Sequence, residues 1–146
     1  MRPRLRLRPL VVVALLALAI GAASCAAKGP RNQARVAALT VGEAVLGIDQ
    51  VERTLFAQNA FDKATHDRVG AIVLKALYAS RSYERAVAAW PDSSLEPSHV
   101  LAARHVLLAI LQELGTILPA SVSGRASFVV AVDVARAALT AAGGGQ

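Results

Sequence analysis

The chain has 146 residues, of which 55% are hydrophobic and 4% aromatic, and its formal net charge is +6. Four arginines and no acidic residue precede the single cysteine, Cys25, so the rest of the chain, with 12 basic and 10 acidic residues, carries only +2. This small excess excludes a basic stripe able to displace many counterions from a nucleic acid, and a single cysteine excludes an internal disulfide.

Residues 1–24 have the three-part pattern of an export signal peptide. The four arginines lie between positions 2 and 8, an apolar run covers 10–20, and small residues follow it. In such a signal the basic residues keep the amino end in the cytoplasm, the apolar run enters the translocation machinery, and the small residues fit a peptidase pocket. We therefore expect the domain that follows to be extracytoplasmic.

The cysteine directly follows this signal. Residues 22–25, Ala-Ala-Ser-Cys, resemble the lipobox of bacterial lipoproteins, which usually has leucine where this chain has Ala22. The resemblance covers about the first 25 residues. It implies that Cys25 is acylated with palmitate-like chains, becomes the new amino terminus and anchors the protein to a membrane. With Ala26 as the next residue, it implies the outer membrane in a diderm host, and otherwise the outer face of the cytoplasmic membrane.

Two other fates of the same residues remain open. Cleavage after Ala26, with Ser24 and Ala26 as the small residues of an A-x-A-like site, would release a soluble exported protein. Alternatively, the apolar stretch 10–27 would stay uncleaved as a signal anchor, for which it has about the minimum length. In all three cases the domain lies outside the cytoplasm.

Residues 25–33 predict a short tether between the anchor and the domain. They contain Gly29-Pro30 and have no apolar periodicity. At about 3.3 Å per extended residue, such a segment reaches no more than roughly 25 Å. The domain is therefore expected to work close to a membrane surface.

Residues 34–142 predict one all-α domain, because alanine, which has the lowest helix cost, is abundant and apolar residues recur with helical spacing. In the first helix this stripe comprises Val41, Ala44, Ile48, Val51 and Leu55. Asn59 is a natural stop for it, and Asp62 or Thr65 would cap a second helix that Pro91 ends. The stripe of the second helix comprises Val69, Ile72, Val73, Ala76, Leu77, Ser80, Tyr83, Val87 and Trp90.

A third helix is expected to begin near Pro97, which suits a first helical turn. Its polar residues gather on a narrow strip: Arg104, His105, Gln112, Glu113 and Thr116. This pattern predicts that the third helix is the most buried, with Leu111 at its centre. A fourth helix follows Pro119 and has one apolar face, formed by Phe128, Val132, Ala135 and Leu139. Short loops then predict a small antiparallel bundle of about four helices, followed by a disordered tail, 143–146.

The three histidines do not have the spacing of metal ligands. His99 and His105 are six residues apart, which turns them about 120° from a common helical face. His66 lies four residues after Asp62 in the first turn of the second helix, where we expect capping and solvation. Glu96 and His99 form a single E-x-x-H spacing, whereas a di-iron bundle requires two such pairs. We expect no metal site and no cofactor.

The remaining charges and aromatic residues carry no catalytic signature. The adjacent pairs Glu52-Arg53 and Glu84-Arg85 are expected on solvated faces, and the aromatic residues are expected to pack in the core or at its edge. The chain has no H-E-x-x-H, C-x-x-C, phosphate-binding loop or G-x-S-x-G motif. We therefore predict that the protein is not an enzyme.

A second apolar line on the first helix suggests a contact surface. Leu39 and Leu46 are seven residues apart, on a line that a small bundle would not fully cover. Ala38 and Gly42 would let another helix approach closely. We predict an exported, membrane-tethered envelope lipoprotein that acts through contacts with a protein partner or a second copy. The alternative is a helical carrier for an apolar small molecule or lipid, because a bundle rich in alanine and valine can enclose a cavity.

Overall fold

The computed structural model describes residues 29–91 and 95–143, and over these it consists of four helices without a strand. They are α2 (Pro30–Ala57), α3 (Lys63–Ala88), α4 (Ser98–Ile117) and α5 (Arg125–Gly143). The prediction of an all-α bundle of four helices is confirmed. The predicted export signal, 1–24, and Cys25 lie outside the described residues, as do the last three residues of the predicted tail.

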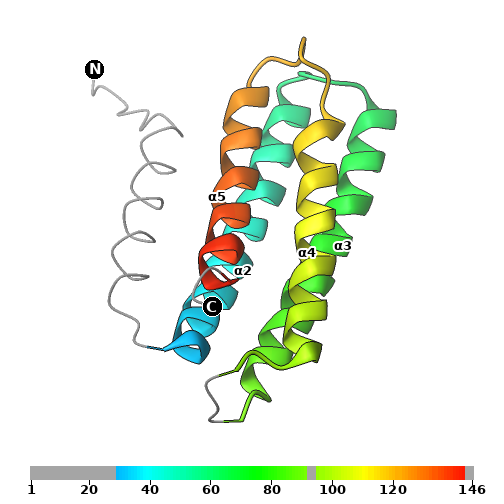
Figure 1. The fold of residues 1–146 in the computed structure, drawn as a ribbon. Helices are drawn as coiled ribbons and strands as arrows, with labels where there is room; N and C mark the ends of the chain where they lie inside the picture. Colours follow the sequence, from blue (N-terminus) through cyan, green and yellow to red (C-terminus); the bar gives the residue numbers. More distant parts are fainter. Residues whose placement is uncertain (1–28, 92–94, 144–146) are drawn as a thin grey trace, which may run out of the picture.

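The helices form an antiparallel ring (Figure 1). α2 packs against α3 and α5, and α4 packs against the same two helices, whereas the diagonal pairs do not touch. The first turn of α2, the last turn of α5 and the connection between α3 and α4 lie together at the end drawn lowest in Figure 1. We call this end the lower end, and the opposite end, where α2 connects to α3 and α4 to α5, the upper end.

Proline sets the helix starts at the lower end. Gly29 has a φ of +85°, and Pro30 then opens α2, where its missing amide costs no helical hydrogen bond. Residues 30–33, which were predicted to belong to the tether, are therefore helical. Pro97 occupies the N-cap of α4, one position before the helix itself.

The turn between α2 and α3 at the upper end follows the sequence prediction. Asn59 adopts a left-handed φ of +55° just after α2, a conformation that asparagine tolerates at a helix end. Asp62 is the N-cap of α3, and its Oδ1 accepts a hydrogen bond from the backbone amide of Thr65 at 2.8 Å. These two residues fix where the chain reverses.

The core is built from all four helices. Leu111 is fully buried, as predicted, and so is the predicted apolar face of the fourth helix. The largest fully buried hydrophobic side chains are Trp90, Tyr83, Phe128, Ile48, Leu107, Leu111, Leu114 and Leu139. Burial of so many large apolar groups is the main stabilising contribution to a domain of this size.

The prediction that the third helix is the most buried is wrong. α4 buries five of its 20 residues, whereas α2 buries ten of 28 and α5 seven of 19. Each helix of a four-membered ring has only two neighbours, so the outer side of α4 is exposed to solvent. This exposed side carries two large apolar residues, Leu101 and Val106. By length and composition alone, α4 and α5 are each long and apolar enough to cross a membrane. In the bundle, 28% of the apolar window of α4 and 33% of that of α5 are buried.

Candidate functional site

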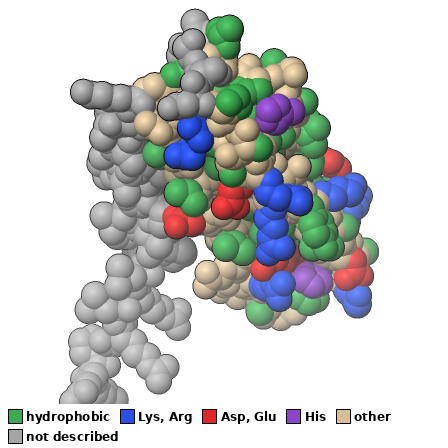
Figure 2. Space-filling view, turned by 90° about the horizontal axis from the view of Figure 1, so that it is seen from below, with side chains coloured by type: hydrophobic (Ala, Val, Ile, Leu, Met, Phe, Trp, Pro, Cys, Tyr) green, Lys and Arg blue, Asp and Glu red, His purple; other side chains and the backbone are tan. Residues whose placement is uncertain are grey.

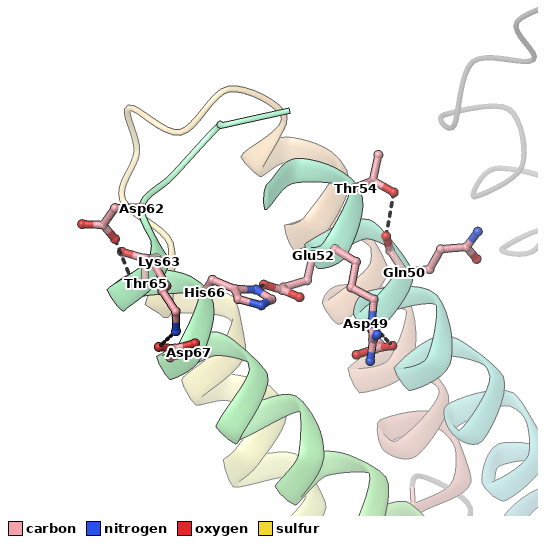
Figure 3. Close-up of polar contacts among 10 residues, drawn as sticks. Asp49, Gln50, Glu52, Thr54, Asp62, Lys63, Thr65, His66 and Asp67 are labelled. Carbon is pink, nitrogen blue, oxygen red and sulfur yellow. Dashed lines mark hydrogen bonds and ion pairs between the residues drawn. The ribbon is translucent and has the colours of Figure 1, made fainter. Parts of the chain in front are cut away.

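A buried carboxylate joins α2 to α3 near the upper end. Glu52 on α2 is 1% exposed, and its Oε1 lies 2.5 Å from Nδ1 of His66 on α3 (Figure 3). The prediction that Glu52 is solvated is wrong, because Glu52 follows Ile48 by four residues and so lies on the same buried stripe. A buried carboxylate requires a hydrogen-bonding partner, and the imidazole supplies it.

An aromatic ring holds the same imidazole from one face. The rings of Phe56 and His66 are stacked, with their centroids 3.9 Å apart and an interplanar angle of 6°. Phe61 lies against Phe56 in turn, at 6.1 Å between centroids. The prediction that His66 is merely solvated beside the helix cap is therefore wrong: its side chain is 29% exposed and is oriented by Glu52 and Phe56.

A surface cleft of about 390 Å³ opens beside this pair, between α2 and α3. Two ion pairs lie next to it, Arg53 Nε to Asp49 Oδ2 at 2.8 Å and Lys63 Nζ to Asp67 Oδ2 at 2.6 Å (Figure 3). The cleft is lined by Asp49, Glu52, Arg53, His66, Asp67, Gly70, Val73, Leu74 and Leu77. A lining with this many charged groups suits polar contacts better than the binding of an apolar molecule.

The chemistry of the Glu52–His66 pair is limited by its neighbours. Within the described part of the chain, no three His, Cys, Asp or Glu side chains are grouped so that they could hold one metal ion. In proton-transfer sites, a carboxylate orients an imidazole whose second nitrogen activates a hydroxyl or thiol. Glu52 is the hydrogen-bond partner of His66 among the described side chains, and no hydroxyl or thiol joins them. The geometry therefore supports a clamp between α2 and α3.

An exposed apolar surface continues from the cleft toward the lower end. On α2, Arg53, Leu46 and Leu39 follow one another at seven-residue steps, so the two leucines lie on the side of the helix that borders the cleft. On α3, Leu74 lines the cleft and Tyr78 lies one turn further down. We call Leu39, Leu46, Leu74 and Tyr78 the apolar strip.

The four members of the apolar strip are all accessible to a partner. Their exposed fractions are 64% for Leu39, 59% for Leu46, 52% for Leu74 and 63% for Tyr78. Counting along both helices from the carboxylate–imidazole contact places residues 39–46 of α2 about level with 72–79 of α3. The strip is therefore one surface across two adjacent helices.

A second buried polar cluster lies at the lower end. Arg104, which was predicted to lie on the narrow polar strip of the third helix, is buried and forms an ion pair with Glu96, with Nη2 and Oε2 2.9 Å apart. Its guanidinium also packs against Gly143, where any Cβ would overlap it. Burial raises the pKa of the neighbouring Tyr83 to about 12, against the opposing effect of the positive charge on Arg104. This cluster fastens the start of α4 to the end of α5.

The structure does not unite the histidines in one site. His99 and His105 are exposed on α4, a helix that does not contact α2, whereas His66 faces Glu52. Sequence reasoning singled out Leu39 and Leu46 but missed the rest of the strip. The sequence did contain a signal for these missed residues. Leu74 and Tyr78 are four residues apart, so they share a helical face, and both lie outside the apolar stripe of the second helix.

Comparison with known proteins identified no relative of this chain. No family model, no curated protein and no solved structure matches the chain. What the protein does is therefore inferred from its own residues, of which the apolar strip and the charges around it are the most informative.

Proposed function

We propose that the chain is an exported, membrane-tethered envelope lipoprotein that acts through protein contacts and not as an enzyme. The observation that carries this proposal is the apolar strip, in which four large side chains, each more than half exposed, gather on one face of α2 and α3. Isolated exposed leucines are common on protein surfaces, but a contiguous group of this kind is typical of an interaction site.

The membrane attachment rests on the lipobox-like residues that end at Cys25. α2 begins at Pro30, five residues later, so an acylated Cys25 would hold the lower end within about 17 Å of the bilayer surface. Leu39 and Leu46 lie about 14 Å and 24 Å from the start of α2 along its axis. A partner attached to the same membrane would meet the strip from the side.

The floor of the strip has room for side chains of a partner. Gly42 lies between Leu39 and Leu46 in sequence, and a Cβ placed on it would meet no atom within 4 Å. Gly70, which lines the cleft above the strip, is equally open. A partner that presents apolar side chains could therefore pack closely against the backbone of both helices.

The test is a double substitution in the full chain, Leu39→Lys with Leu46→Lys. Because both side chains are more than half exposed, we expect the helical melting curve to stay within a few degrees of the parent. We expect crosslinking in intact envelopes and sedimentation in mild detergent to show that the variant has lost the parent's complex. The matched control is Leu101→Lys with Val106→Lys, which places the same charges at exposed apolar positions of α4 and should preserve the complex.

Two results would contradict the proposal. A parent chain that sediments as a monomer and forms no specific crosslink at the strip would remove the contact. A complex that survives the strip substitutions, or that the α4 control disrupts equally, would place the contact elsewhere on the molecule.

A further inference from the structure

Three arginines lie together on the α2/α3 face near the lower end. Arg81 and Arg85 are one turn apart on α3, and all three side chains, including Arg35 on α2, are exposed. The pairing of the two helices places Arg35 about level with Tyr83, between the other two. Figure 2, which views the molecule from below, shows several Lys and Arg side chains near one another, with Asp, Glu and His side chains among them. We call Arg35, Arg81 and Arg85 the arginine patch.

The charges of the arginine patch are not neutralised within the bundle. Four of the other cations are paired with carboxylates: Arg53 with Asp49, Lys63 with Asp67, Arg104 with Glu96 and Arg136 with Asp133. Arg125 donates to the backbone oxygen of Leu118, and among the described residues Arg68 and Lys75, like the patch, form no ion pair with a carboxylate. Over residues 29–91 and 95–143, no ion pair joins a patch arginine to a carboxylate, and Arg85 donates only to the backbone oxygen of Arg81, at 3.3 Å. The exposed Glu84 is the acidic neighbour, so the patch keeps a net positive charge.

The same end of the molecule also presents an apolar side chain. Leu95, which leads into α4 at the lower end, is 73% exposed, the largest exposed fraction among the large hydrophobic residues that the structure describes. Basic side chains and an exposed apolar side chain at the same end of a molecule are a combination with which peripheral proteins contact anionic bilayers.

We propose that the arginine patch binds the headgroups of anionic phospholipids and thereby sets the orientation of the bundle on the membrane. This inference rests on the membrane attachment proposed above, because an anchor at Cys25 would keep the lower end, near which the patch lies, within about 17 Å of the bilayer. Leu95, at the same end of the bundle, would then also lie near the interface. The apolar strip begins one helical turn above Arg35, on the same face of α2 and α3.

The reach of the tether makes the orientation depend on charge. The five residue steps from Cys25 to Pro30 allow the lower end to lie anywhere from contact to about 17 Å from the surface. Electrostatic attraction decays over about 8 Å at physiological ionic strength, so it acts only when the patch approaches the headgroups. Each arginine near an anionic surface favours the contact roughly fivefold, and three together favour it on the order of a hundredfold.

The single tryptophan provides the measurement. Trp90 follows α3 at the lower end, so energy transfer from Trp90 to dansyl-labelled headgroups reports how close this end lies to the bilayer. The full acylated chain is reconstituted into vesicles of phosphatidylcholine alone or of phosphatidylcholine with phosphatidylglycerol. We expect higher transfer in the anionic vesicles and loss of this difference at high salt.

Substitutions assign the effect to the patch. Arg35→Gln with Arg81→Gln and Arg85→Gln should abolish the dependence on phosphatidylglycerol. The control, Arg53→Gln with Lys63→Gln and Arg68→Gln, removes the same number of charges from the upper end and should retain that dependence. Circular dichroism establishes that both variants remain helical.

The outcomes separate this inference from the proposed function. The intact mass of the reconstituted chain shows whether it is acylated, and an unacylated chain would overturn both proposals. An acylated chain whose energy transfer is the same in neutral and anionic vesicles would overturn only the binding of headgroups by the patch. If the patch variant and its control lost the dependence of energy transfer on phosphatidylglycerol equally, headgroup binding could not be assigned to the arginine patch at the lower end.

Discussion

The contact between Glu52 and His66 places a buried carboxyl group where two helices meet. Removing the imidazole leaves the carboxylate without its hydrogen-bonding partner, at 1% exposure. We predict that His66→Ala lowers the free energy of unfolding by about 2 kcal/mol. The free energy of unfolding is measured by urea denaturation, monitored by circular dichroism. The variants are His66→Ala, Glu52→Ala and the double variant that carries both substitutions. The double variant should lose less than the two single losses combined, and strict additivity would show that the residues do not interact.

Tyr83 makes stability dependent on alkaline pH. Its pKa rises from 10.0 to about 12 on folding, chiefly through burial, so the unfolded chain loses its proton first as the pH increases. Protonated Tyr83 therefore contributes about 2 to 3 kcal/mol to the free energy of unfolding. This contribution is fully present below pH 10 and is lost as the pH rises toward about 12. Tyr83→Phe should therefore flatten the loss of unfolding free energy above pH 10. A parallel decline in both proteins would contradict this assignment.

At the scale of the helices, two glycines have opposite roles. Gly124, just before α5, has a φ of +81°, and a Cβ there would lie 2.5 Å from Cδ2 of Leu55. We predict that Gly124→Ala lowers the free energy of unfolding by about 1 to 3 kcal/mol, because both the backbone and the neighbouring leucine must adjust. Chemical denaturation measures it, and a variant as stable as the parent would show that the turn is not confined.

Gly42 is the matched comparison inside a helix. A Cβ there meets nothing within 4 Å, so Gly42→Ala should raise the free energy of unfolding by about 0.5 to 1 kcal/mol through helix propensity alone. The same substitution adds a methyl group to the floor of the apolar strip. A stabilised variant whose complex is weakened would support packing of a partner over Gly42, whereas destabilisation would show that the space is occupied in the isolated chain.

Helical periodicity accounts for the elements of the fold better than for the contacts between them. The apolar stripes, Asn59 and Asp62 were sufficient to predict four helices and the turn between the first two, because these signals are local. The burial of α4 was overestimated, since an almost wholly apolar sequence does not tell how many neighbours a helix has. In a ring of four helices, each helix has two neighbours, and Leu101 and Val106 remain exposed on the outer side of α4.

At the scale of the whole molecule, the candidate site depends on the register between α2 and α3. The position of Glu52 on the stripe of Ile48 was readable from the sequence, but its partner was not, because His66 meets it only after the chain reverses. The apolar strip was half predicted for the same reason: Leu39 and Leu46 lie on one helix, and their neighbours Leu74 and Tyr78 come from the other. Charges and apolar residues thus form a surface only once two helices are aligned.

The proposed membrane tether underlies both the proposed protein contact and the proposed orientation of the bundle. The most direct test is the intact mass of the mature chain purified from bacterial membranes, together with fractionation of Cys25→Ala. We predict a chain that begins at an acylated Cys25 and a variant that leaves the membrane fraction, because two or three buried acyl chains make detachment negligible. A soluble mature chain that begins after Ala26 without lipid, or an uncleaved chain that stays in the membrane equally well as Cys25→Ala, would contradict this account.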